Sequence, residues 1–344
     1  MSGLEVWKAS VHVAGMAERT GAQAERDGFD GLSFGDTQDI AADPYCGLCL
    51  AARATERLKL LVGVTNPVTR NAAVTAASIA TVQAESAGRA ILGIGRGDSS
   101  LGHLRLPPAT VRETERYVGR VQAYLGDGGE SEDKPATLRW VAQAGLPKVP
   151  VDVAATGPRV ISLGARWAER VTVNVGAIPE RVSWALAVAR RAGSEDRKIS
   201  SPLSLGAYVV VAVHPDSRVA GELARGPLAA YAHLSGMSGA GGEQLDESDR
   251  SVVQAVAADY DPRFHGRKEG RHAAHLDDRF ARRFGVVGSP SHCARRLVEL
   301  VELGVERLLV VEGLDPSQPE EQRRAHDLLM HEVLPDVRER AGAG

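Results

Sequence analysis

The sequence has few cysteines, no long apolar run and little net charge, and each shortage excludes a class of protein. Three cysteines, an odd number, do not form the paired framework of a disulfide-rich protein and are typical of a reducing cytoplasm. No apolar stretch approaches the roughly 18 residues that a membrane span needs. A net charge of -3 over 344 residues gives no reason to expect nucleic acid or a membrane surface as a partner.

Other expected signals are also missing. Residues 1–8 show no basic region followed by an apolar one, so we expect no secretory signal and predict a cytoplasmic protein. Cys46 and Cys49 form a Cys-x-x-Cys pair, but no second pair follows at metal spacing. We therefore interpret them as small apolar residues one turn apart on a helix that begins at Asp43-Pro44, and we predict no metal site.

A glycine-rich loop is the clearest feature that is present. The apolar run 89–94 leads directly into Gly95-Arg96-Gly97-Asp98-Ser99-Ser100. Glycines let the backbone approach a ligand and arginine forks onto anions, so the loop suits phosphate oxygens. A Walker loop is excluded because there is no lysine, and a dinucleotide fingerprint is excluded because Gly97 comes one residue early. The alternative is a glycine-rich turn that binds nothing.

Strand and helix patterns alternate along the chain. Eight short, apolar, β-branched runs are typical of parallel strands covered on both faces. The alternation predicts one domain over residues 1–344, a closed (β/α)8 TIM barrel, with a doubly wound sheet plus a second domain as the alternative. The predicted strands cover 4–10, 31–35, 58–64, 89–94, 149–154, 170–175, 204–213 and 305–311, and the predicted helices 15–27, 44–55, 71–85, 107–125, 159–167, 179–192, 289–303 and 320–333.

Two segments interrupt this alternation. Residues 126–148 are predicted to be a surface excursion, and residues 226–288 form a long insertion between the seventh and eighth strands. A structureless loop of that size is rare in a compact domain, so we expect helices in the insertion. Its position after strand 7 predicts a lid over the C-terminal mouth of the barrel. Its basic residues either favour an anionic substrate or are ordinary solvated side chains, which we favour; they are Arg263, Arg267, Lys268, Arg271 and Arg279.

Functional residues of a (β/α)8 barrel lie just after its strands. The residues that this rule selects are polar, mostly neutral and rich in glycine, with no carboxylate cluster for Mg²⁺ and no nucleophile–base pair. They therefore predict a cradle for a large cofactor. The set comprises Ser10, His12, Asp36, Thr37, Gln38, Thr65, Asn66, Arg70, Arg96–Ser100, His103, Thr156–Arg159, Asn174, Gly176, His214 and Glu312.

The chain resembles the luciferase-like monooxygenase superfamily, barrels of the bacterial-luciferase type that use FMN or the deazaflavin coenzyme F420. The resemblance lies in segments 28–36, 61–67, 88–99, 155–158 and 286–290, in order and at strand positions. Within the superfamily the chain looks most like the branch containing methylene-tetrahydromethanopterin reductase. The resemblance implies an F420-dependent oxidoreductase with a small-molecule substrate, and a homodimer.

The resemblance also implies roles for individual residues. Asp36 would hydrogen-bond near the ring, with a helix N-cap as the alternative. Gly63-Val64 occupies the position where these enzymes often have a non-prolyl cis peptide. Asn66 would reach the ring or the ribityl chain, with a turn before Pro67 as the alternative. The other implied contacts are Arg96, Gly97, Ser99 and Ser100 at the side chain or phosphate, and Thr156, Gly157 and Pro158 on the opposite side of the cofactor.

His12 is the predicted proton-transfer residue. It follows strand 1, where a related sugar-phosphate dehydrogenase has an acidic residue near the hydride-accepting carbon, and histidine titrates near neutrality. Thr37 stands where those relatives have a histidine directly after the strand-2 aspartate. A sugar-phosphate substrate is therefore not implied.

Three functions remain open from the sequence. The first is an F420-dependent oxidoreductase that passes hydride to or from a C=C, C=N or C=O group. The second is an FMN-dependent monooxygenase that activates O₂, and the third is a non-catalytic barrel subunit, against which the intact cradle argues. The basic residues do not decide between the cofactors. FMN ends at a phosphate, whereas F420 continues into a lactyl and oligoglutamate tail that needs an open exit.

Overall fold

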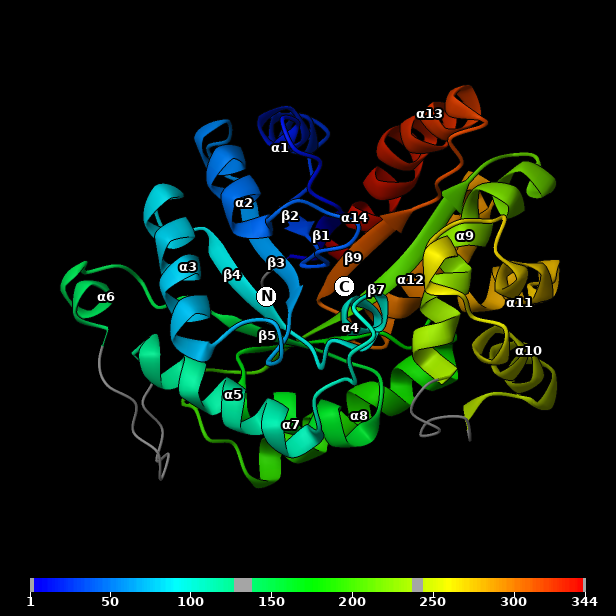
Figure 1. The fold of residues 1–344 in the computed structure, drawn as a ribbon. Coiled ribbons are helices and arrows are strands. Elements are labelled where there is room, and N and C mark those ends of the chain that lie inside the picture. The colour runs from blue at the N-terminus through cyan, green and yellow to red at the C-terminus, as the bar shows by residue number, and fades with distance from the viewer. Residues whose placement is uncertain (1–2, 127–137, 237–243, 343–344) are drawn as a thin grey trace.

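In the computed structural model, eight parallel strands form a closed ring with helices outside it (Figure 1). The structure describes residues 3–126, 138–236 and 244–342. The ring closes because β6 pairs with β7, β7 with β9 and β9 with β1, all in parallel. The predicted (β/α)8 barrel is therefore confirmed. The ring strands are β1 (Glu5–Ser10), β2 (Gly31–Phe34), β3 (Lys59–Thr65), β4 (Ala90–Ile94), β5 (Val151–Ala155), β6 (Arg170–Val173), β7 (Ser204–Val213) and β9 (Arg307–Glu312).

Helices alternate with these strands and cover the ring (Figure 1). None in the described ranges has both the length and the apolar character to cross a membrane. They are α1 (Ala17–Arg26), α2 (Pro44–Arg53), α3 (Ala72–Glu85), α4 (Asp98–His103), α5 (Val111–Tyr124), α6 (Arg139–Gln143), α7 (Pro158–Trp167), α8 (Pro179–Glu195), α9 (Ser217–Gly236), α10 (Glu247–Ala258), α11 (Asp278–Phe284), α12 (Pro290–Glu302), α13 (Pro319–Leu328) and α14 (Leu334–Gly342), with shorter turns η2 (Pro262–Phe264), η3 (Arg271–His275) and η4 (Leu329–Val333).

Capping side chains fix where several helices begin. The Asp43 carboxylate accepts a hydrogen bond from the Cys46 N–H and Pro44 occupies the first turn, so α2 begins where predicted. The predicted start of the 107–125 helix at Pro107 and Pro108 is wrong. Thr110 and Glu113 form a capping box instead, and this reciprocal pair of hydrogen bonds starts α5 at Val111.

The insertion is helical and has a hydrophobic core of its own. It contains α10, α11 and part of α9, which already begins at Ser217, nine residues before position 226. Leu228, Val253 and Phe280 belong to one buried cluster that joins these helices to β7. A short strand that was not predicted, β8 (Val286–Gly288), pairs with the end of β7. Residues 127–137 of the predicted excursion and 237–243 of the insertion lie outside the described residues.

The inside of the ring is apolar in its middle and polar toward the amino ends of the strands. Trp7, Tyr208 and Leu309 belong to the inner apolar cluster. Below it, Arg307 is 1% exposed and donates to Asp152 Oδ2 at 3.1 Å and to Thr172 Oγ1 at 2.9 Å. Burial lowers the pKa of Arg307, and the Asp152 carboxylate opposes that shift. This ion pair joins β5 to β9 across the ring.

Removing the charge of Asp152 is expected to destabilise the barrel. Asp152→Asn leaves a buried guanidinium without its counter-charge, which costs about 3 kcal/mol or more of unfolding free energy. Urea denaturation measures this loss. The exposed i,i+4 pair Arg191–Glu195 supplies the control, and Glu195→Gln is expected to leave the midpoint unchanged. Equal, small effects of both variants would contradict a structural role for the buried pair.

Candidate active site

The predicted site residues lie at one end of the ring because all its strands run parallel. The carboxyl ends of such strands share one rim. His12 follows β1, Asp36 follows β2 and Asn66 follows β3. The remaining predicted residues are Gly63 and Val64 in β3, Arg96 and Gly97 between β4 and α4, Ser99 and Ser100 in α4, Thr156 and Gly157 after β5, and Pro158 at the start of α7.

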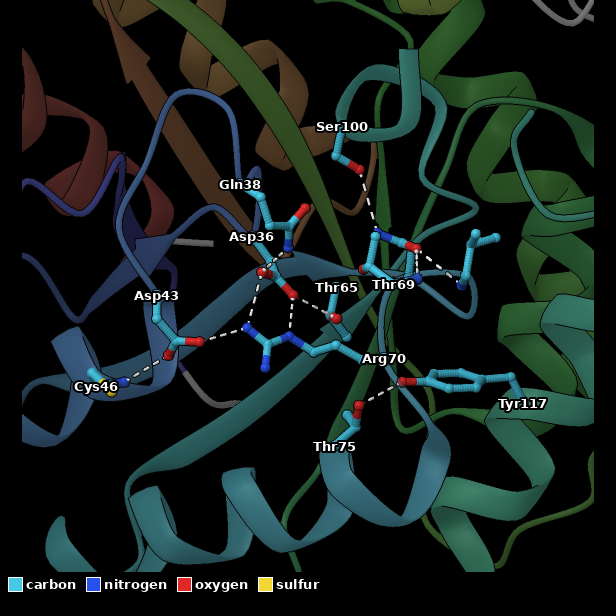
Figure 2. A network of polar contacts seen from close by, with 12 residues as sticks. Asp36, Gln38, Asp43, Cys46, Thr65, Thr69, Arg70, Thr75, Ser100 and Tyr117 are labelled. Atoms are coloured by element: carbon cyan, nitrogen blue, oxygen red, sulfur yellow. Dashed lines mark hydrogen bonds and ion pairs between the residues drawn. The ribbon is translucent and has the colours of Figure 1, made fainter. Parts of the chain in front are cut away.

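Asp36 is at the centre of a polar network on this rim (Figure 2). Its carboxylate is 1% exposed and accepts hydrogen bonds from Thr65 Oγ1 and Gln38 Nε2, each at 2.7 Å. Arg70 donates two more, from Nε at 2.8 Å and Nη2 at 3.3 Å. Four bonds use the acceptor positions of a carboxylate. The alternative interpretation of Asp36 as a helix N-cap is wrong, because Asp43 caps α2.

Arg70 is the cation that compensates the buried carboxylate. Its Nη2 also donates to Asp43 Oδ2 at 2.6 Å, and its guanidinium lies 4.6 Å from the centre of the Tyr45 ring. Burial acts to lower the pKa of Arg70, but the bonds to Asp36 and Asp43 outweigh it and raise that pKa. Sequence analysis placed Arg70 after the third strand without giving it a role. The signal that could have revealed this role is Asp36, a lone carboxylate at the end of the neighbouring strand, because such a group requires a cation nearby when it is buried.

Asn66 connects the loops that follow β3 and β4. Its Oδ1 accepts from the Val68 and Thr69 N–H groups, both at 3.0 Å, so the turn predicted as the alternative is confirmed. Its Nδ2 also donates to Ser100 Oγ at 3.3 Å. One residue thus shapes its own loop and fixes the position of the next.

The Gly63–Val64 peptide bond is cis, as the resemblance predicted. A Cβ at Gly63 would stand 2.0 Å from Ser33 Oγ, so any other residue there would require Ser33 to move. The role of these residues toward a cofactor remains a prediction.

The glycine-rich loop is the start of a short helix rather than an open turn. Gly97 has φ +89°, a left-handed conformation that favours glycine, and α4 follows at once. Ser100 is buried, while Arg96 Nε donates to the Ala109 carbonyl at 2.6 Å. Sequence analysis missed α4 because its glycines and serines are typical of a loop.

His12 presents a buried nitrogen without a partner. Its ring is 5% exposed and stacks on Phe34 with 5.4 Å between ring centres. Nδ1 lies 2.7 Å from the Asp43 carbonyl oxygen, which only accepts, so Nδ1 carries the proton and Nε2 carries the free electron pair. Nε2 has no hydrogen-bond partner among the described residues. This geometry is that of a base held in one tautomer.

A second unpartnered acceptor lies on another side of the rim. Asn174 follows β6, and its Oδ1 is buried without a hydrogen bond in the described part of the chain. Buried polar atoms are normally paired, so two unpaired acceptors on one rim fit a polar ligand between the strand ends. No three His, Cys, Asp or Glu side chains among the described residues gather as metal ligands.

Comparison with known proteins agrees with this arrangement. The family model described as luciferase-like monooxygenase matches residues 9–307. The chain belongs to the luciferase-like monooxygenases. The resemblance seen in the sequence is thereby confirmed.

Relatives within the luciferase-like monooxygenases match along nearly the whole chain. A 5,10-methylenetetrahydromethanopterin reductase of Methanolobus tindarius is 26% identical over 86% of this chain and 89% of the relative. An F420-dependent glucose-6-phosphate dehydrogenase of Microbacterium testaceum is 28% identical over 93% of this chain and 92% of the relative. The solved F420-dependent tetrahydromethanopterin reductase of Methanopyrus kandleri has a TM-score of 0.73 at 22% identity, covering 98% of this chain and 100% of that one. The structural likeness shows the same fold.

In this luciferase-like barrel the insertion contributes a cluster of neutral aromatic side chains. His233 of α9 stacks on Tyr260 with 3.5 Å between ring centres, and the Tyr260 hydroxyl bonds to His265 Nδ1. His265 in turn meets His103 of α4, 5.5 Å away. Burial lowers the pKa of both His233 and His265 to about 4. The cluster therefore joins the insertion to the loop after β4 while uncharged.

Three of the five basic residues singled out in the insertion have acidic partners. Arg263 pairs with Asp261, Lys268 with Asp315, and Arg279 with Asp246 and Asp249. These ion pairs neutralise the positive charges that would otherwise attract an anionic substrate. These pairs weigh against the anionic-substrate alternative for the three residues, which form ion pairs rather than standing as the solvated side chains that the sequence favoured.

Acidification is expected to destabilise the protein through this cluster. A histidine whose pKa is lower in the folded protein than in the unfolded chain makes stability depend on pH. Its contribution to the free energy of unfolding is fully present above the unfolded pKa of 6.5 and is lost as the pH falls toward the folded pKa of about 4. Unfolding free energy, measured in urea at pH 7.5 and 5.0, should fall less in His265→Asn than in the wild type. His331→Asn, at an exposed position outside the cluster, is the control and should leave the difference unchanged. An unaltered pH dependence in His265→Asn would contradict the interpretation.

Proposed function

We propose that this chain is a coenzyme F420-dependent oxidoreductase. It transfers a hydride between the deazaflavin and a C=C, C=N or C=O group of a small organic substrate. The observation that carries the proposal is the unpartnered, tautomerically fixed His12 Nε2 on the rim of a luciferase-like barrel. Relatives along almost the full chain, among them an F420-dependent dehydrogenase, support this choice of cofactor.

The residues of the rim would bind the cofactor and handle a proton. When bound, F420 supplies the carbon that gives or takes the hydride. Asn66 and Ser100 would hold the ring or ribityl chain, with the Asp36–Arg70 pair fixing the loops on which they lie. His12 would take or return the substrate proton at Nε2, while its Nδ1–H bond to the Asp43 carbonyl fixes the tautomer.

The remaining cofactor contacts would come from the loops after β4 and β5. Arg96, Gly97 and Ser99 would face the phosphate. Thr156, Gly157 and Pro158 would line the opposite side of the cofactor.

The insertion 226–288 would act as a lid on the single domain 1–344. It contacts two separate loops of the rim. Ser235 Oγ lies 3.4 Å from the Asn174 carbonyl after β6, and His265 meets His103 of α4. A segment fixed to both loops is placed to cover a substrate and exclude water.

The homodimer that the resemblance implies is part of this proposal.

Titration of the purified protein with F420 and with FMN tests the cofactor. Ring fluorescence should report saturable binding of F420 and markedly weaker binding of FMN. Tight binding of FMN alone would replace the proposal with the FMN-dependent monooxygenase. Binding of neither would favour the non-catalytic subunit.

Loss of the base is expected to reduce turnover without loss of cofactor. In His12→Ala, turnover of a carbonyl, imine or enone substrate, followed by F420 absorbance, should fall about 100-fold or more. The remaining activity should lack the pH limb that reports the histidine, while the F420 dissociation constant changes little. His331→Ala serves as the control. Unchanged turnover and an unchanged pH profile in His12→Ala would exclude this role.

A further inference from the structure

One tyrosine inside the ring has a hydroxyl group that the protein itself does not use. Tyr208 lies in the middle of β7, and its ring packs in the inner apolar cluster with Trp7 and Leu309. The residue is 7% exposed, and its hydroxyl makes no hydrogen bond among the described residues. A polar atom is thus placed inside an apolar cluster without a protein partner.

The hydroxyl reaches the end of the ring where the predicted site residues lie. A Cβ placed on Gly63 would stand 3.3 Å from the Tyr208 oxygen and 2.0 Å from Ser33 Oγ. Gly63 belongs to the cis peptide near the carboxyl end of β3, and Ser33 is the last residue but one of β2. Because β7 lies opposite β3 in the ring, Tyr208 extends across the interior to the rim.

The insertion brings a second tyrosine to the same place. The ring centre of Tyr231, from α9, lies 6.0 Å from that of Tyr208. Tyr231 is only partly buried, as are two further residues that pack on the inner cluster, Ala154 near the end of β5 and Val311 near the end of β9. These side chains form a neutral, partly open floor beneath the insertion, and the Tyr208 hydroxyl is a polar group within it.

An unpaired buried hydroxyl is unfavourable unless a ligand completes it. Such groups normally have partners, because burial removes their hydrogen bonds to water. The buried Tyr117 hydroxyl shows the ordinary arrangement, with Thr75 Oγ1 at 2.6 Å. The Tyr45 hydroxyl also lacks a partner, but it is fully enclosed, whereas the Tyr208 oxygen keeps accessible surface and can meet a ligand.

The Tyr208 hydroxyl acts as a donor because it keeps its proton. Burial raises the pKa of Tyr208 well above its ordinary value. We propose that Tyr208 is a catalytic residue, whose hydroxyl donates a hydrogen bond to the oxygen or nitrogen of the substrate double bond that exchanges the hydride. The inference rests on the proposed function and narrows its substrate class to carbonyls, imines and enones, since an isolated C=C has no atom to accept this bond.

Such a donor acts where negative charge develops. When the hydride of the reduced cofactor adds to the carbon of a C=O group, a C–H bond forms and the π electron pair moves to the oxygen. The Tyr208 O–H stabilises that oxygen without transferring its proton. The proton that completes the alcohol comes from His12 in its protonated form, and the cofactor is oxidised as the carbonyl is reduced. The same contacts serve the reverse reaction.

Tyr208→Phe tests the donor because it removes the hydroxyl and keeps the ring in the inner cluster. With the carbonyl, imine or enone that the wild type turns over, kcat at saturating F420 should fall about 100-fold or more. The KM of that substrate should change far less, because the hydrogen bond strengthens in the transition state. The F420 dissociation constant should stay unchanged.

A second measurement uses the protein without cofactor and does not depend on turnover. The probe is acetophenone labelled with ¹³C at its carbonyl, a neutral aromatic ketone that suits the floor. Infrared difference spectra should place the C=O stretch of the bound probe at lower frequency in the wild type than in Tyr208→Phe, because a hydrogen-bond donor polarises the carbonyl.

Thermal unfolding separates this role from a structural one. Tyr208→Phe should unfold at the same temperature as the wild type or higher, because the hydroxyl has no protein partner to lose. The control Tyr117→Phe loses its bond to Thr75 and should unfold at a lower temperature, with kcat and the acetophenone band unchanged. Tyr124→Phe, at a partly buried position on α5, should change none of the three readouts.

Two results would overturn the role of Tyr208 while F420 binding remains intact. One is an equal kcat or an equal C=O frequency in the wild type and Tyr208→Phe. The other is a loss of kcat that accompanies a lower unfolding temperature and an unchanged C=O band, which would make the hydroxyl structural. A wild type that shifts the acetophenone band but binds no F420 would instead remove the proposed function and keep the hydrogen bond from Tyr208.

Discussion

The rim of the barrel depends on the burial of one carboxylate, Asp36, against Arg70. Without a cation, a charged group 1% exposed would be strongly unfavourable. Arg70 meets that requirement and also binds Asp43, so the end of β2, the loop after β3 and the start of α2 are held by one guanidinium. Asp43 then accepts the Nδ1–H of His12 through its backbone carbonyl. The tautomer of the proposed base therefore follows from the same contacts that keep Asp36 buried.

The sequence predicts the barrel better than it predicts the rim, and the reason is the range of the interactions involved. Strands are visible because their apolar runs are local, and the start of α2 is visible because Asp43 and Pro44 adjoin it. α5 was placed too early because two prolines resemble a first turn, whereas the competing capping box of Thr110 and Glu113 supplies paired hydrogen bonds. Arg70 received no role because its partner lies 34 residues away, and no local pattern shows such a pair.

The residues of the glycine-rich loop, which the sequence presents as one feature, have different structural roles. Gly97 supplies the left-handed backbone that starts α4, and Ser100 receives the amide of Asn66 from the neighbouring loop. Arg96 is held through Nε by the Ala109 carbonyl, in the segment before α5. Residues that are close in the sequence thus contact different segments. Composition alone does not reveal these contacts, because the partners of Arg96 and Ser100 lie 13 and 34 residues away along the chain.

Charge pairing, more than charge content, describes the environment that the insertion offers to a ligand. The chain carries 41 basic and 44 acidic residues, so its net charge says little about any one site. Toward the insertion, acidic partners neutralise Arg263, Lys268 and Arg279, and burial keeps His233 and His265 uncharged near neutral pH. If the insertion is the lid that we propose, its paired cations and neutral rings suit a substrate whose reacting end is uncharged.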